Sequence, residues 1–85
     1  MVNPGSQPTE IELGMRVEAS GHLGYVRFLG TTAFAAGRWA GIELDLPQGK
    51  NSGIVEDQRY FECRPLHGLF VRVTQVRIVT EGTTQ

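Results

Sequence analysis

The sequence has few cysteines, no long apolar run, no signal peptide and little net charge, and each of these absences excludes a class of protein. It contains a single cysteine among 85 residues, which excludes an internal disulfide and fits a reducing compartment. No apolar run is long enough to span a membrane, and residues 1–9 contain no signal-peptide core. The net charge of −1 argues against a disordered chain and against a strongly basic nucleic-acid binder. We therefore expect a small cytosolic domain that binds neither nucleic acid nor membrane.

The small net charge hides an uneven distribution of charged residues. Three of the nine acids, Glu10, Glu12 and Glu81, lie near the two ends of the chain. The segment between them holds all eight cations and the other six acids, so its charge is about +2. An acidic partner is therefore the one that this central segment favours.

What is present is typical of an all-β domain. Apolar residues alternate with polar ones or cluster as β-formers in short stretches, and no stretch shows sustained helical spacing. Eleven glycines supply frequent turns, and short strands must close on themselves to avoid open edges, so we expect a small antiparallel β-barrel. The expected strands are residues 15–19, 23–29, 39–44, 53–55, 58–62, 68–73 and 78–79.

The domain organisation expected from the composition is simple. Residues 1–12 form a flexible leader, residues 13–79 form the domain, and residues 80–85 form a flexible tail. The polar ends and short length also suggest a domain taken from a longer protein.

A glycine-flanked turn at residues 49–53 is the first candidate for a binding site. Lys50 offers a positive charge and Asn51 offers a donor pair and an acceptor, held between residues that permit positive φ. This combination suits a ligand that carries carboxylates. The alternative is a solvated hairpin turn with an incidental lysine.

Several aromatic residues are candidates for a binding patch next to the Lys50 turn. In residues 69–73, Phe70 and Arg72 alternate with three aliphatic residues and so share the opposite face of the strand. Phe34 stands alone in a loop of small residues, and Trp39 follows that loop. These aromatics either plug the ends of a small barrel or line a concave patch beside the Lys50 turn.

We find no pattern that indicates catalysis or a cofactor. Cys63 and His67 are four residues apart, but they lie in a turn and lack a third, orienting group. These two residues and His22 do not have the spacing of a zinc module. The Gly49-Lys50 pair is not a phosphate loop, because Leu44 replaces the required glycine and Asn51 the magnesium-binding Ser or Thr. We therefore expect a binding module rather than an enzyme, with no cofactor and no metal.

Taken together, these motifs resemble the CAP-Gly family of microtubule-associated domains. The matching stretches follow one another in the family's order and spacing, and together they cover essentially the whole expected domain. They are residues 24–30 (GYVRFLG), 34–45 (FAAGRWAGIELD), 49–53 (GKNSG), 60–63 (YFEC) and 67–72 (HGLFVR).

The resemblance implies both a fold and a ligand. The fold would be an SH3-like antiparallel β-barrel with long glycine-rich loops. The ligands would be the acidic Glu-Glu-Tyr/Phe C-terminal tails of α-tubulin and end-binding proteins, and the zinc-knuckle tails of cytoplasmic linker proteins. Such a domain would act on microtubules in the cytoplasm, in plus-end tracking or dynactin-type proteins.

The family's peptide-binding positions carry over to eight residues of this chain. Lys50, Asn51 and the adjoining Ser52 would meet the ligand's acidic groups, three aromatics would form an apolar groove, and two polar residues would contact its rim. The groove residues are Phe34, Trp39 and Phe70, and the rim residues are Arg72 and Gln75.

Ser52 is the one departure from the family's usual loop, which has Asp at this position. Losing a negative charge there should not harm the binding of an acidic tail, whereas phosphorylation of Ser52 should repel it. A small barrel that binds nucleic acid or a modified lysine remains an alternative, although Lys50 and Arg72 would repel a cationic ligand.

Overall fold

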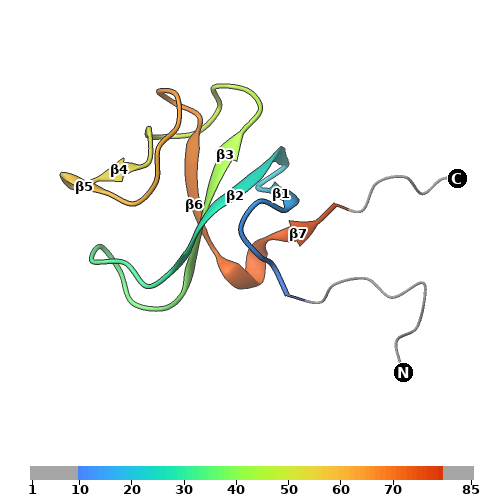
Figure 1. Ribbon diagram of the computed structural model, residues 1–85, viewed down its shortest axis with the longest axis horizontal. Coiled ribbons are helices and arrows are strands. Elements are labelled where there is room, and N and C mark those ends of the chain that lie inside the picture. Colours follow the sequence, from blue (N-terminus) through green and yellow to red (C-terminus); the bar gives the residue numbers. More distant parts are fainter. Residues whose placement is uncertain (1–9, 80–85) are drawn as a thin grey trace, which may run out of the picture.

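The computed structural model describes residues 10–79. Residues 1–9 of the expected leader and all of the expected tail, residues 80–85, lie outside the described residues. The described part is made of short strands and one 3-10 helix (Figure 1). The elements are β1 Arg16–Ala19, β2 His22–Gly30, β3 Trp39–Leu44, β4 Ile54–Val55, β5 Gln58–Arg59, β6 Gly68–Arg72, the 3-10 helix η1 Val73–Gln75, and β7 Arg77–Ile78.

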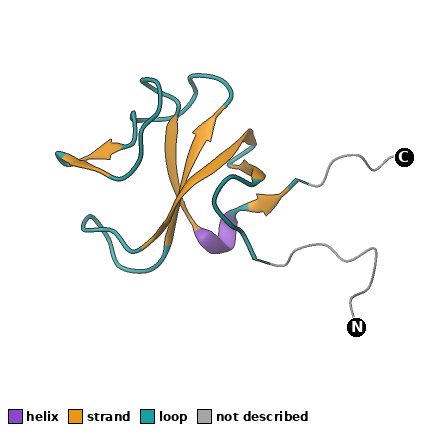
Figure 2. Ribbon diagram, viewed as in Figure 1, coloured by secondary structure: helices purple, strands orange, loops and turns teal. Residues whose placement is uncertain are grey.

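Five of the strands form one antiparallel sheet, so the predicted all-β class is confirmed. Their order is β6-β3-β2-β1-β7, and β4 pairs only with β5 in a separate hairpin (Figure 2). The predicted closure of the barrel does not occur in the described residues: β6 and β7 are the two edges, and no ladder joins them. The long edge of β6 is therefore left without a partner strand over most of its length.

Alternation along the strands places the aliphatic side chains on one face of the sheet. β3 is buried along nearly its whole length because it lies between β2 and β6. The predicted aliphatic face of β6 is present, with Leu69 and Val71 buried and Phe70 on the other face. The buried core consists of Val17, Ala19, Val26, Ala40, Ile42, Leu44, Leu69 and Val71.

Strand β6 ends one residue earlier than the sequence predicts. The N–H of Val73 still donates to the carbonyl of Arg38, at 3.3 Å, but the N–H of Val76 then bonds to the carbonyl of Val73. This second bond turns the chain out of the sheet into η1. Val73 and Val76 nevertheless pack against the core, so the turn covers part of the side where the barrel is open.

The predicted strand at residues 58–62 is also shorter in the structure, where β5 ends at Arg59. The N–H groups of Tyr60 and Phe61 both point to the carbonyl of Gly53, at 2.8 and 3.4 Å, rather than to a neighbouring strand. Their rings instead pack against the outer face of the main sheet. At the N-terminal boundary, Ile11 packs against the core although the sequence suggests a flexible leader there.

Candidate functional site

The Lys50 loop is fixed to the start of β6 by backbone hydrogen bonds. The N–H of Lys50 donates to the carbonyl of Gly68 at 2.8 Å, and the N–H of Gly68 donates to the carbonyl of Asn51 at 2.8 Å. The N–H of Gly49 bonds to the carbonyl of Leu66 at 2.7 Å. The loop is thus held by its main chain, and the exposed side chain of Lys50 remains available to a ligand.

Asn51 has a structural role in this loop as well as a predicted binding role. Its Oδ1 accepts the N–H of Gly53 at 2.9 Å, which closes an Asx-type turn around Ser52. Gly53 has a φ of 94°, a conformation that glycine adopts without strain. Because Oδ1 is used within the loop, the amide Nδ2 is the part of Asn51 that can donate to a carboxylate.

The three predicted groove aromatics lie together on the outer face of the sheet. The centre of the Phe34 ring lies 5.3 Å from the centre of the Trp39 ring and 5.2 Å from that of Phe70, and both pairs pack edge to face. Such pairs are worth about 0.5–1.5 kcal/mol beyond their buried area, so they fix the ring positions. The loop of small residues therefore folds back onto the sheet, where the rings of Trp39 and Phe70 cover Phe34.

A second set of aromatic residues, which is absent from the predicted site, supports this cluster. The rings of Phe28, Tyr60 and Phe61 all contact the ring of Phe70, with ring centres 5.9, 5.4 and 5.5 Å apart. The hydroxyl of Tyr60 also accepts the N–H of Ala33 at 2.9 Å, which ties the Phe34 loop to the end of β5. The adjacent aromatics Tyr60 and Phe61, inside the predicted strand at residues 58–62, are the sequence signal that could have indicated this support.

A groove of about 360 Å³ runs from these aromatics to the Lys50 loop. Its walls include three consecutive β6 residues, whose side chains alternate between the two faces, so the groove follows the unpaired edge of the strand. Five of the eight predicted site residues line it. The lining residues are Ser20, Phe34, Trp39, Lys50, Asn51, Val55, Leu69, Phe70 and Val71.

The other three predicted residues do not line this groove. Arg72 stands at its edge, with its guanidinium 4.6 Å from the centre of the Trp39 ring and one nitrogen donating to the carbonyl of Ala36 at 3.2 Å. Ser52 lies in the turn behind Asn51, where its carbonyl accepts the N–H of Cys63. Gln75 is the last residue of η1, beyond the end of β6.

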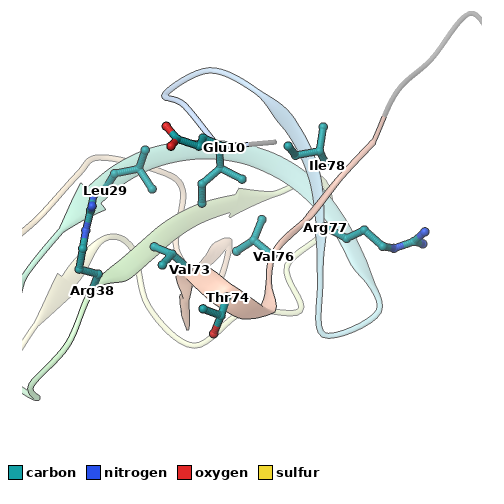
Figure 3. Close-up of a pocket in the computed structure, with 9 residues that line it drawn as sticks. Glu10, Leu29, Arg38, Val73, Thr74, Val76, Arg77 and Ile78 are labelled. Atoms are coloured by element: carbon teal, nitrogen blue, oxygen red, sulfur yellow. The ribbon is translucent and has the colours of Figure 1, made fainter. Parts of the chain in front are cut away.

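A larger hollow, of about 650 Å³, lies near the other end of the sheet (Figure 3). Its lining is mixed, and the side chain of Arg77 is directed away from the aliphatic residues. The lining residues are Glu10, Ile11, Leu29, Arg38, Val73, Thr74, Val76, Arg77 and Ile78. None of the eight predicted site residues lines this hollow.

Cys63 and His67, the two residues considered for catalysis, each bond to a different backbone carbonyl. The Nδ1 of His67 lies 2.8 Å from the carbonyl of Leu44, and the thiol of Cys63 donates to the carbonyl of Arg64 at 3.4 Å. Burial raises the pKa of the Cys63 thiol, which opposes formation of the nucleophilic thiolate. Among the described residues, no three metal-binding side chains gather and no helix has the length and apolarity to cross a membrane.

The comparisons with known proteins agree on one family. The chain is 43% identical to dynactin subunit 1 of Xenopus laevis over 74 residues, 85% of this chain and 6% of that protein. It is 48% identical to dynactin subunit 1 of Drosophila melanogaster over 71 residues, 81% of this chain and 6% of that protein. The chain thus spans a small fraction of the relatives' length.

Solved structures show the same fold. The CAP-Gly domain of human kinesin-like protein KIF13B matches with a TM-score of 0.82 and 37% identity, over 100% of this chain and 90% of that one. A Bik1 CAP-Gly domain with an ETF peptide from Bim1 matches with a TM-score of 0.69 and 28% identity, over 74% of this chain and 78% of that one. The CAP-Gly domain family model matches residues 13–76. The predicted family is confirmed: this chain belongs to the CAP-Gly domain family.

Proposed function

We propose that this domain binds acidic protein C-termini that end in an aromatic residue, of the Glu-Glu-Tyr/Phe type. The observation that carries the proposal is the groove itself, which has aromatic walls at one end and the cation of Lys50 at the other. The guanidinium of Arg72 adds a second positive charge at the groove's edge, beside Trp39. An apolar side chain and several carboxylates on one short peptide match this arrangement.

Each part of the groove has a distinct task in this proposal. The aromatic walls bury the ligand's terminal ring, which is worth on the order of 2 kcal/mol. Lys50 and the Nδ2 group of Asn51 donate to carboxylates, and charge-assisted bonds contribute roughly 1.5–3 kcal/mol each before ordering costs. A disordered tail loses entropy when it is ordered, so we expect net affinity near micromolar, about −7 to −8 kcal/mol.

The comparison with Bik1 supports this choice of ligand. That CAP-Gly domain was solved with an ETF peptide from Bim1, and in one-letter code ETF is Glu-Thr-Phe. The peptide therefore combines an acidic and an aromatic residue, the two features for which the groove of the present chain is suited.

By the same reasoning we assign the partners and the cellular site. The proposed ligands are the C-terminal tails of α-tubulin and of end-binding proteins, and the zinc-knuckle tails of cytoplasmic linker proteins. The proposed location is the microtubule cytoskeleton of the cytoplasm, in keeping with relatives that include dynactin subunit 1 and a restin homologue of Drosophila melanogaster (54% identical over 55 residues, 65% of this chain and 3% of that protein).

Of the two alternative ligands predicted from the sequence, nucleic acid and a modified lysine, the modified lysine finds little support in this geometry. An aromatic cage must leave the faces of its rings open to the cation. Here the guanidinium of Arg72 already lies over the ring of Trp39. A cationic ligand would therefore compete with a residue of the domain itself.

A titration with two synthetic peptides tests the proposal. One peptide ends in Glu-Glu-Tyr and the other lacks the final Tyr. We expect the first to bind near micromolar and to bind more weakly as salt rises, because the charges at the groove's rim are screened. The second should bind at least about tenfold more weakly, since it lacks the ring that the aromatic walls bury. Equal affinity for both peptides would contradict the proposal.

A further inference from the structure

A second charged surface, separate from the groove, is centred on Tyr25 in β2. Tyr25 is 39% exposed, and the guanidinium carbons of Arg16 and Arg27 lie 4.7 and 5.3 Å from the centre of its ring. Arg16 of β1 is the cross-strand partner of Tyr25, so the two side chains share one face of the sheet. Cation–π contacts of this kind hold both guanidiniums against the exposed ring.

Two ion pairs fix the same guanidiniums from the other side. The Nε of Arg27 donates to Oε1 of Glu43 at 2.9 Å, and the terminal nitrogens of Arg16 donate to both carboxylate oxygens of Asp45, at 2.8 and 2.6 Å. Because Arg27 uses its Nε in this pair, its two terminal nitrogens are left, and residues 10–79 provide no recorded acceptor for them.

Two further arginines come from the end of β5 and from the loop that follows it. Arg59 and Arg64 are both exposed. Burial, and after it the charge of Glu43, raise the pKa of the Cys63 thiol. Three guanidiniums oppose this rise, those of Arg64, Arg27 and Arg59, so all three lie around the same thiol.

The surface has more positive than negative charges. After the hydrogen bond from Arg16, the charge of Arg64 also helps to hold the pKa of the Asp45 carboxyl low, so Arg64 lies near this ion pair too. In the described part of the chain no ion pair is recorded for Arg59 or Arg64. Four guanidiniums therefore accompany two carboxylates, and counting the exposed Glu62 of the same loop still leaves a positive excess. We call Tyr25, the four arginines and their two acids the Tyr25 patch.

The Tyr25 patch lies on the face of the sheet that also carries Phe70. Glu43 and Gly41 are two residues apart on β3 and so share a face, and Gly41 pairs with Phe70. Glu43 itself pairs with Gly68, which holds the Lys50 loop, and Tyr25 is one strand further from β6 (Figure 1). At about 4.8 Å per strand, Tyr25 is roughly 10 Å from β6. No residue of the patch lines the groove or belongs to the eight predicted site residues.

We propose that the Tyr25 patch is a second binding surface, for an acidic protein segment that need not end in an aromatic residue. The terminal nitrogens of Arg27 and the guanidiniums of Arg59 and Arg64 offer planar pairs of donors, which suit carboxylates in a bidentate arrangement. The inference goes beyond the proposed function, because it assigns another surface to another feature of a ligand.

The aromatic ring of the patch argues for carboxylates rather than for the phosphates of a nucleic acid. A single strand of nucleic acid binds by stacking its bases on exposed aromatic faces. The guanidiniums of Arg16 and Arg27 already lie over the ring of Tyr25, so a base would have to displace them. The net charge of −1 for the whole chain also disfavours a polyphosphate ligand.

Binding at this surface is weak by itself, since its charges are exposed and screened by salt. For a short acidic peptide at low ionic strength we expect a Kd of about 0.1–1 mM. A partner that also places a tail in the groove would gain from the patch through effective concentration, because both contacts would then belong to one complex.

A peptide of six glutamates, acetylated and amidated at its ends, is the probe, because it has carboxylates and no terminal aromatic. At low salt it should shift the NMR signals of the Nε–H groups of Arg27, Arg59 and Arg64, and the shifts should fade as salt rises. We expect Arg64→Gln to weaken its binding about threefold or more. Absence of binding at low salt would overturn the inference.

Arg38→Gln is the matched control, because it removes the same charge from an exposed arginine at the opposite end of β3. It should change the Kd of the hexaglutamate peptide less than about 1.5-fold. Equal losses in Arg64→Gln and Arg38→Gln would show that the peptide responds only to the total charge of the domain, and the inference would be wrong.

The two surfaces are separated by exchanging variants and peptides. Lys50→Ala should weaken binding of the Glu-Glu-Tyr peptide and change that of hexaglutamate less than about twofold, and Arg64→Gln should show the reverse. Hexaglutamate binding that depends on Lys50 instead of Arg64 overturns the inference and leaves the proposed function standing. Hexaglutamate binding as expected, without any binding of the Glu-Glu-Tyr peptide, overturns the proposed function and leaves the inference standing.

A single-stranded oligonucleotide with six phosphates tests the class of ligand. At the same salt concentration it should bind more weakly than hexaglutamate, because its bases find no open aromatic face in the patch. Tighter binding of the oligonucleotide that is lost in Arg64→Gln would overturn the assignment of this surface to an acidic protein segment.

Discussion

Lys50 divides its tasks between its main chain and its side chain. The N–H of Lys50 fastens the loop to Gly68, while the side chain is exposed and faces the groove. Asn51 does not separate the tasks in this way, because its Oδ1 holds Gly53 in place while its Nδ2 is assigned to the ligand. Substitutions of Lys50 therefore test binding without disturbing the fold, whereas substitutions of Asn51 change both.

The first prediction concerns Lys50→Ala. We expect binding of the Glu-Glu-Tyr peptide to weaken about tenfold, since a charge-assisted bond is lost, while the midpoint of thermal unfolding stays within about 2 °C. Calorimetric titration and thermal unfolding followed by circular dichroism measure the two quantities. Arg77→Gln, far from the groove, should leave the Kd unchanged; an unaltered Kd for Lys50→Ala would rule out a role for this cation.

Gly68 supports a second prediction because a side chain there would strike the loop. An added Cβ would lie 2.9 Å from the carbonyl oxygen of Asn51 and 3.0 Å from the nitrogen of Gly53, closer than such atoms normally approach. We expect Gly68→Ala to displace the loop, lower stability by about 1–3 kcal/mol and weaken peptide binding.

The matched control for this change is Gly21→Ala. A Cβ at Gly21 meets nothing within 4 Å, but φ there is 84°, so the change costs about 1 kcal/mol in backbone strain alone. Chemical denaturation and peptide titration should show that both variants lose stability and that only Gly68→Ala loses affinity. Normal affinity in Gly68→Ala would mean that the loop position does not matter for binding.

At the scale of elements, an ion pair links β1 to the end of β3 across β2. Arg16 in β1 makes two hydrogen bonds, of 2.8 and 2.6 Å, to the carboxylate of Asp45, the residue after β3. The N–H of Asp45 also bonds to the carbonyl of Leu23 in β2, at 3.0 Å. The hydrogen bond from Arg16 holds the pKa of the Asp45 carboxyl below its ordinary value of 3.8.

The third prediction is the pH dependence that follows from this pKa. A carboxyl whose pKa is lower in the folded state stabilises the fold above pH 3.8, and the stabilisation is lost as pH falls through the lowered value. We expect Asp45→Asn to be less stable than the parent at pH 7 and equally stable once the pH is well below 3.8. Denaturant titrations at pH 7 and pH 2.5 measure the difference, and a constant gap between the two proteins would contradict the assignment.

The sequence predicted some elements well because local alternation determines them. The alternating pattern around Phe70 gave the two faces of β6 correctly, and the glycine-flanked Lys50 turn was found in its predicted place. Strand ends were less predictable. Val73 has the β-branched side chain of a strand residue, yet the bond from Val76 to its carbonyl starts η1, and no local pattern signals that bond.

The arrangement of the site was predictable only in part, because edges and supports depend on the tertiary fold. Which strand of a sheet is left unpaired follows from the order β6-β3-β2-β1-β7, which alternation along one strand cannot reveal. The support that Phe28 and Tyr60 give to Phe70 likewise joins residues distant in sequence. The groove aromatics were identified by residue type and family position, and their supporting rings were not.

At the scale of the whole molecule, the domain has a small core and therefore a small reserve of stability. The fully buried side chains of largest volume are Ile42, Leu44, Val17 and Val26. A chain of this size has a free energy of unfolding of about 4–13 kcal/mol, at roughly 0.05–0.15 kcal/mol per residue. The proposed binding face takes Phe70 and its neighbouring rings to the outside of the sheet, which leaves an almost entirely aliphatic interior to hold the fold.

The last prediction follows from the central position of Ile42, which is 0% exposed and lies between β2 and β6. Ile42→Ala should cost about 2–5 kcal/mol, a large part of the total, whereas Ile42→Val should cost about 0.5–1.5 kcal/mol. Because Ile42 faces the core and the groove lies along the edge and outer face of β6, the valine variant should bind the Glu-Glu-Tyr peptide as tightly as the parent. Denaturant unfolding and peptide titration of the two variants check this separation. If Ile42→Val lost affinity in proportion to its stability, the groove would depend on the packing of the core as a whole, and the assignment of binding to the β6 edge and the Lys50 loop alone would be wrong.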